Sequence, residues 1–219
     1  MDSEFAVIFD VDGVLVDSYK AHFRSWQMLC QERGLAMSQD QFVATFGRTS
    51  REIIADLWGD HAGSDAAIAE FDDLKEAYYR DILRDNFPAM DGAVELIDAL
   101  AAAGVRLAVG SSGPPENVYL VLDHLDRRQC FGGVVTGTDV QRGKPDPQVF
   151  QLGAERLGVA PQRCVVVEDA PAGVQAAHAA GMKCVAIAST GRVREDLRSA
   201  ELIVDSLCEL TVEQFRQLL

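Results

Sequence analysis

Short apolar runs recur along the chain and alternate with segments whose apolar residues have helical spacing. Six runs are present: Phe5 to Phe9, Val105 to Val109, Val134-Val135, Cys164 to Val167, Cys184 to Ile187 and Leu202 to Val204. Runs of this kind are typical of strands buried on both faces of a parallel sheet. Three of the helical patterns stop at Gly104, Gly158 and Gly181, which predicts left-handed C-caps. The alternation therefore predicts an α/β fold built on a doubly wound parallel sheet.

The first part of the chain departs from this alternation. The stretch between Asp12 and the helical pattern beginning at Ala93 is several times longer than the dozen or so residues of a parallel crossover. Its pattern predicts four amphipathic helices, over Ala21 to Gln31, Gln39 to Phe46, Arg51 to Trp58 and Ala66 to Leu83, with breaks at Gly34 and Gly59. We therefore expect two domains, an α/β core of residues 1–16 and 88–219 and an inserted helical cap of residues 17–87.

Charge and composition exclude several classes of function. The 20 Lys and Arg face 34 Asp and Glu, a formal net charge of −14, so a basic face for nucleic acid is not expected. No apolar run approaches the ~20 residues of a membrane helix, and Met1 to Glu4 carries acids where a secretory signal needs basic residues. The five cysteines are scattered without a CxxC pair, which predicts reduced packing residues. We expect a cytoplasmic monomer with no nucleic-acid or membrane partner.

Two pairs of acidic residues follow predicted strands. Asp10 and Asp12 come after the first strand, and Glu168-Asp169 follows the fourth. Open α/β sheets collect their sites at the carboxyl ends of the strands, so these acids should converge. Oxygen ligands without a His or Cys cluster favour a hard cation, and Mg²⁺ fits because it shares phosphate oxygens. Alternatively, the first pair belongs to a solvated loop and Asp169 is only the N-cap of the next helix.

Two further segments contain groups that suit a phosphate. Ser111-Ser112-Gly113 follows the second predicted strand and precedes a helix, so a hydroxyl and bare backbone amides lie where phosphate oxygens bind. Lys144 lies within Gly143 to Pro147 and offers a positive charge in an acidic chain. Each segment has a simpler alternative, because Ser and Gly fill ordinary turns and a loop lysine commonly faces solvent.

Together these segments resemble a known family. In chain order, DVDGVLVDS (10–18), SSG (111–113), GKPDP (143–147) and VVEDAPAG (166–173) are similar to the four motifs of the haloacid dehalogenase-like superfamily of phosphohydrolases. The inserted helices resemble its helical cap, so the resemblance covers essentially the whole chain.

The resemblance implies a mechanism through an aspartyl phosphate, with Mg²⁺ as the cofactor. It makes Asp10 the nucleophile and Asp12 the general acid and base, and it places Ser111 and Lys144 on the phosphoryl oxygens. The metal would be held by Asp10, Asp12, Glu168 and Asp169. The halide-removing branch of the superfamily lacks the second acid of the first motif, so Asp12 favours phosphate chemistry.

Within the cap, two segments resemble substrate-contacting parts of relatives. His22 stands ten residues after Asp12, as a histidine does in the hinge of β-phosphoglucomutase. Residues 47–51, GRTSR, resemble the cap segment that contacts substrate there and in sugar-phosphate phosphatases. The expected substrate-binding residues are Ser112, His22, Arg48 and Arg51.

Each cap residue also has a structural alternative. His22 could be a packed side chain, and the two arginines could be surface charges on a helix. Lys75 is expected on a charged helix face, and its role is left open. Phe23, Trp26 and Leu29 have the spacing of a cap core.

We therefore expect a Mg²⁺-dependent phosphatase of a small phosphorylated metabolite, a sugar phosphate, with the cap closing over the site and supplying specificity. One alternative is a β-phosphoglucomutase-like mutase that uses the same nucleophile. Another is a catalytically silent, phosphate-binding regulatory protein. The presence of both Asp10 and Asp12 argues against the silent protein, since binding alone would not need the pair.

Overall fold

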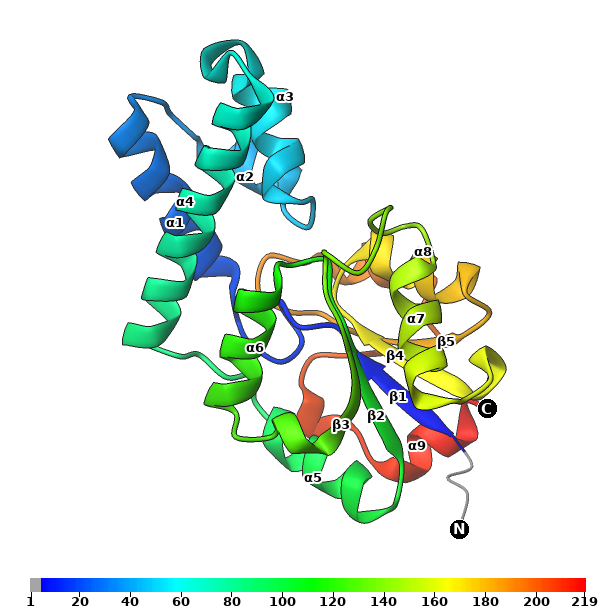
Figure 1. Cartoon of the computed structure of the whole chain (residues 1–219). Coiled ribbons are helices and arrows are strands. Elements are labelled where there is room, and N and C mark those ends of the chain that lie inside the picture. The colour runs from blue at the N-terminus through cyan, green and yellow to red at the C-terminus, as the bar shows by residue number, and fades with distance from the viewer. Residues whose placement is uncertain (1–4) are drawn as a thin grey trace. The chain divides into compact units, whose positions relative to one another are not determined.

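The computed structural model describes residues 5–219 (Figure 1). The acidic segment from Met1 to Glu4, which bears on the export signal, lies outside the described residues. The chain divides into two compact units, Met1–Asp17 with Ala89–Leu219 and Ser18–Pro88. The boundaries expected from the sequence lie one residue before each of these divisions.

A six-stranded parallel sheet forms the centre of the first unit, which confirms the predicted doubly wound fold. The strands run in the order β3-β2-β1-β4-β5-β6. Their bounds are Ala6–Phe9 (β1), Arg106–Gly110 (β2), Phe131–Val135 (β3), Cys164–Glu168 (β4), Lys183–Ile187 (β5) and Leu202–Val204 (β6). All four residues of β1 are buried, as a strand in the middle of a covered sheet requires.

Helices cover both faces of this sheet (Figure 1). They are α5 (Ala93–Ala102), α6 (Pro115–His124), α7 (Gln148–Leu157), α8 (Pro171–Ala179) and α9 (Val212–Gln217). α7 and α8 pack on one face, where Phe150 and Val174 meet Ile8 and Val166 of the sheet. α5 lies against β2 from the other side. Gly158 ends α7 in the left-handed conformation, at φ 64°, as predicted.

The strand order creates a switch point beside β1. From β1 the chain proceeds to β2 and β3 on one side, and it then returns to β4, β5 and β6 on the other. Phe9 is in register with both Val109 and Val167, so the residues that follow these three positions emerge at one level. Open α/β sheets bind ligands at such a point, outside the carboxyl ends of the strands.

Four helices form the second unit. They are α1 (Tyr19–Arg33), α2 (Gln39–Thr45), α3 (Ser50–Ala62) and α4 (Asp65–Asp85). Trp26, Leu29 and Phe42 lie in its buried core and Phe23 packs against it, which confirms the predicted cap core.

The predicted break at Gly59 is found one residue earlier, as a kink at Trp58. The backbone leaves helical geometry at Trp58, with φ −139°, but α3 continues to Ala62. The left-handed C-cap is Gly63, whose N–H donates to the Gly59 carbonyl. The Trp58 ring is buried beside Trp26 at this kink.

Two further observations concern the class of protein. None of the helices described between residues 5 and 219 is long and apolar enough to cross a bilayer. All five cysteines are free, as predicted, and Cys30, Cys164 and Cys184 are buried. Cys208 is exposed, so the prediction that every cysteine is a packing residue is wrong there.

Candidate active site

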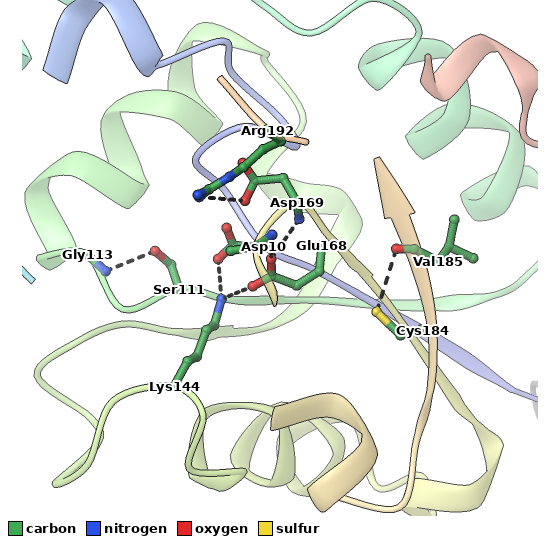
Figure 2. A network of polar contacts seen from close by, with 10 residues as sticks. Asp10, Ser111, Gly113, Lys144, Glu168, Asp169, Cys184, Val185 and Arg192 are labelled. Carbon is green, nitrogen blue, oxygen red and sulfur yellow. Dashed lines mark hydrogen bonds and ion pairs between the residues drawn. The ribbon is translucent and has the colours of Figure 1, made fainter. Parts of the chain in front are cut away.

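Three buried carboxylates gather at the carboxyl ends of β1 and β4 (Figure 2). Asp10 directly follows β1, Glu168 is the last residue of β4, and Asp169 comes next. One oxygen from each lies within 4.8 Å of the others, and the three residues are 7%, 0% and 1% exposed. The alternative of a solvated loop is therefore wrong for Asp10. This geometry suits ligands that share one cation.

Lys144 connects two of these carboxylates from the loop between β3 and α7. Its Nζ lies 2.6 Å from Asp10 Oδ1 and 2.6 Å from Glu168 Oε1. The ammonium also lies 4.9 Å from the centroid of the Phe150 ring, and the side chain is 10% exposed. The alternative of a solvent-facing lysine is therefore wrong.

Both oxygens of Glu168 are engaged. Oε1 accepts from Lys144, and Oε2 accepts from the backbone N–H groups of Asp169 and Ala170, each at 2.7 Å. A Cβ at Gly173, in the first turn of α8, would lie 1.8 Å from Glu168 Oε1. The glycine of the VVEDAPAG segment therefore makes room for the carboxylate that holds Lys144.

Asp169 is held on one side by two donors. Ser189 Oγ and Arg192 Nε each donate to Oδ2 at 2.9 Å, whereas Arg192 Nη2 lies 3.5 Å from Oδ1. A Cβ at Gly13, whose φ is +75°, would lie 2.1 Å from the same Oδ2. The N-cap of α8 is Ala170, without a side-chain cap, so the alternative role of Asp169 as an N-cap is wrong.

Burial is the main influence on the pKa values of this site. Burial raises the pKa of Asp10 well above its usual value, and Glu168 and Asp169 add to this against the opposing effect of Lys144. Burial also raises the pKa of Asp169, which Arg192 lowers and Glu168 raises. Burial lowers the pKa of Lys144, but the negative charges of Asp10 and Glu168 raise it by a larger amount. The pKa of Lys144 therefore lies above its usual value.

The donor set therefore fits Mg²⁺. It offers oxygen atoms alone, and its three buried carboxylates outnumber Lys144 and Arg192, the two cations shown in contact with them among the described residues, so a further cation would balance their charge. Both oxygens of Glu168 already accept hydrogen bonds. Asp169 Oδ1 and Asp10 Oδ2 together accept fewer hydrogen bonds from the described residues than the two Glu168 oxygens do.

The side chains of Asp12 and Ser111 both lie close to Gly113. A Cβ at Gly113 would lie 3.3 Å from Ser111 Oγ and 3.9 Å from Asp12 Oδ2. Ser111 is buried and its Oγ accepts the N–H of Gly113 at 3.0 Å. Asp12 is not in the group of three carboxylates, and its role at the metal stays a prediction, as does the substrate contact of the half-buried Ser112.

The remaining predicted residues belong to the helical unit. His22 is half-buried on α1. Its Nδ1 lies 2.9 Å from the Nζ of Lys75, which is 1% exposed, so the expected place of Lys75 on a charged helix face is wrong. Arg48 is exposed and lies 3.0 Å from Asp56, and Arg51 is exposed at the start of α3. These surroundings suit the alternative of surface charges for the two arginines, and their contacts with substrate stay predictions.

The sequence interpretation missed Ser189 and Arg192. Both lie in the segment that follows β5, and they contact Asp169 because β5 pairs with β4. The signal that could have found them is the polar run Ser189 to Arg192 directly after an apolar run, the same pattern that marks Asp10 and Asp169.

Comparisons with known proteins identify the family to which this fold belongs. The family model of the haloacid dehalogenase-like hydrolases matches residues 6–181. Hexitol phosphatase A of Escherichia coli is 35% identical over 94% of this chain and 92% of its own length. Validoxylamine A 7'-phosphate phosphatase of Streptomyces hygroscopicus is 32% identical over 93% and 94%. The crystal structure of β-phosphoglucomutase from Clostridium difficile covers 98% of this chain and 96% of its own, with 26% identity and a TM-score of 0.86. The sheet, the four motifs and the matching model together show that the chain belongs to the haloacid dehalogenase-like hydrolase family.

Proposed function

We propose that the enzyme is a Mg²⁺-dependent phosphatase of a small phosphorylated metabolite, a sugar phosphate, and that Asp10 is its nucleophile. The observation that carries the proposal is Lys144 Nζ, 2.6 Å from Asp10 Oδ1, beside two more buried carboxylates. Two relatives that match over nearly the whole chain are named as phosphatases, which supports hydrolysis over other chemistries of the family.

In the first half-reaction, a carboxylate oxygen of Asp10 forms a bond to phosphorus as the bond to the leaving alkoxide breaks. Asp12 gives its proton to that alkoxide. Lys144 and Ser111 bind the phosphoryl oxygens, which become more negative in the transition state. When bound, Mg²⁺ supplies positive charge that offsets repulsion between the nucleophile and the phosphoryl group.

In the second half-reaction, water hydrolyses the aspartyl phosphate. Asp12, now ionised, takes a proton from the attacking water, and inorganic phosphate leaves as Asp10 is regenerated. Glu168 keeps Lys144 in place throughout, because its Oε1 lies 2.6 Å from the same ammonium that contacts Asp10. The metal would be held by Asp10 and Asp169, with Asp12 and Glu168 beside them.

The unit of residues 18–88 is proposed as the cap domain that provides substrate specificity. Its candidate contacts are His22, Arg48 and Arg51, with Ser112 from the core. We propose that the enzyme works as a monomer in the cytoplasm, and its free thiols support that location.

The second candidate is a mutase, favoured by the structural similarity to β-phosphoglucomutase. A mutase must keep water from the aspartyl phosphate until a sugar hydroxyl attacks, whereas a phosphatase admits water. Incubation with β-glucose 1-phosphate and a bisphosphate primer, with both products measured, separates them. We expect phosphate release with little glucose 6-phosphate, and isomerisation that outruns phosphate release would establish the mutase instead.

The metal site has its own prediction. Asp169→Asn should weaken Mg²⁺ binding by about 10- to 100-fold, because it removes a charged ligand while Ser189 and Arg192 can still hold the amide. Calorimetry with MgCl₂ measures this directly. Asp40→Asn, at an exposed position in the other unit, makes the same change of charge and should leave the affinity unchanged. Unchanged affinity in Asp169→Asn would place the metal elsewhere.

A further inference from the structure

The turn that follows β5 brings a cation against one of the three buried carboxylates. Arg192 Nε donates to Asp169 Oδ2 at 2.9 Å, and Arg192 Nη2 lies 3.5 Å from Asp169 Oδ1 (Figure 2). The Arg192 side chain is 12% exposed and that of Asp169 is 2% exposed. The ion pair is therefore largely withdrawn from solvent, and its charges are only weakly screened.

This turn is fixed to the core at several points. The Arg192 N–H donates to the Ser189 carbonyl at 3.0 Å, and Ser189 Oγ donates to the same Asp169 Oδ2 at 2.9 Å. Between them, Thr190 Oγ1 donates to Asp17 Oδ2 at 2.9 Å. Asp169 is therefore held in one orientation, with two donors on Oδ2, and Ser189 would still hold that oxygen if the guanidinium were removed.

Arg192 supplies Asp169 with positive charge of the kind that a bound cation would supply. Lys144 contacts Asp10 and Glu168, whereas the cation in contact with Asp169 is Arg192. Burial raises the pKa of Asp169, and the charge of Arg192 is the largest effect that lowers it. A guanidinium and a divalent cation at one carboxylate repel each other and compete for its negative charge.

We propose that Arg192 is an internal counterion that opposes Mg²⁺ at Asp169 and thereby sets the affinity of the site for the metal. In the metal-free protein its guanidinium neutralises a carboxylate that is costly to bury alone. When Mg²⁺ binds, the same charge makes binding weaker. Arg192 is a positioning residue, because it acts on the metal through Asp169. The inference rests on the proposed function, in which Asp169 is a ligand of Mg²⁺.

The first test removes the charge and keeps a donor. The amide nitrogen of Gln is as many bonds from the backbone as Nε of Arg, so Arg192→Gln can still donate to Asp169 Oδ2. We expect calorimetry with MgCl₂ to show roughly tenfold tighter binding than in the wild type, the effect of one charged hydrogen bond. A merely structural role predicts weaker binding, because a displaced Asp169 is a poorer ligand. Unchanged or weaker binding would overturn the proposal.

Two further variants separate local charge from other effects of the change. Arg192→Lys keeps a cation, so its Mg²⁺ affinity should stay close to that of the wild type. Arg194→Gln is the matched control, because this arginine is half exposed and pairs with Asp205 at 2.6 Å. It makes the same change of charge two residues away and should leave the affinity unchanged. Binding as tight as in Arg192→Gln, in either of these two variants, would overturn the role of the Arg192 charge.

The last test needs no variant that lacks the arginine charge. In the wild-type protein, NMR follows the Nε–H signal of Arg192, which is assigned by its loss in Arg192→Lys. We expect its proton to move upfield as MgCl₂ is added, because its hydrogen bond to Asp169 weakens. A signal that does not move at saturating Mg²⁺ would overturn the proposal. Equal Mg²⁺ affinity in the wild type and Arg192→Gln overturns this inference alone, whereas absence of Mg²⁺ binding in both overturns the metal of the proposed function as well.

Discussion

Asp10→Asn is expected to lower kcat by roughly 10⁴-fold or more while the fold stays intact. The amide has no charge with which to attack phosphorus, and it is a poor ligand for Mg²⁺. Its carbonyl oxygen can still accept from Lys144. Because Lys144 also keeps its contact with Glu168, no buried charge loses its last partner, and the free energy of unfolding should change by only about 1 kcal/mol.

Hydrolysis of an aryl phosphate with Mg²⁺, and thermal unfolding in chelator, measure the two expected results. Asp91→Asn is the matched control, since this exposed acid of the core undergoes the same change of charge. A folded Asp10→Asn protein with full activity would contradict the nucleophile assignment. Undiminished wild-type activity in chelator would contradict the metal, and inactivity of the wild type on every phosphorylated compound would favour the silent phosphate-binding protein.

Lys144→Met is expected to affect both stability and turnover. Two buried carboxylates lose their shared cation, and breaking a buried ion pair in this way costs about 3–5 kcal/mol in the free energy of unfolding. The phosphoryl oxygens lose a positive charge in the transition state, so kcat should fall by roughly 10²- to 10³-fold. Denaturant unfolding and steady-state kinetics measure these changes.

A second variant separates the two effects. In Lys144→Met/Glu168→Gln the unpaired charge of Glu168 is also removed, so much of the lost stability should return while kcat stays low. Lys183→Met is the control, because this lysine is half exposed and lies 3.4 Å from Glu201. Recovery of turnover together with stability would show that Lys144 serves the fold and not the reaction.

The fold could be predicted because its strands carry an unambiguous local signal. Residues 6–9 and 164–168 are uniformly buried, and strands buried on both faces require continuous apolar runs. In the helical unit, the ends of the helices were harder to predict from the sequence. α3 kinks at Trp58, beside the predicted break at Gly59, but helical geometry resumes and continues to Ala62, and no local pattern indicated that continuation.

The residues of the site also fall into those that could be predicted from the sequence and those that could not. Asp10, Glu168 and Asp169 could be found because each lies where a strand ends, and Lys144 because its segment matches a family motif. Arg192 could not, since its role depends on the pairing of β5 with β4, which the sequence does not state. Lys75 has an ordinary helical surrounding in sequence, and its partner His22 lies 53 residues away.

The central place of β1 imposes an order on synthesis. Its four residues leave the ribosome well before their hydrogen-bond partners in β2 and β4, and β4 begins only at Cys164. A nascent chain can complete the helices of residues 18–88 long before this strand acquires both neighbours. Such distant pairing is slow and leaves apolar strand edges exposed. Until Glu168 and Asp169 have been translated, Asp10 lacks the two carboxylates that lie beside it at the end of β4, so no shorter nascent chain can assemble the proposed metal ligands.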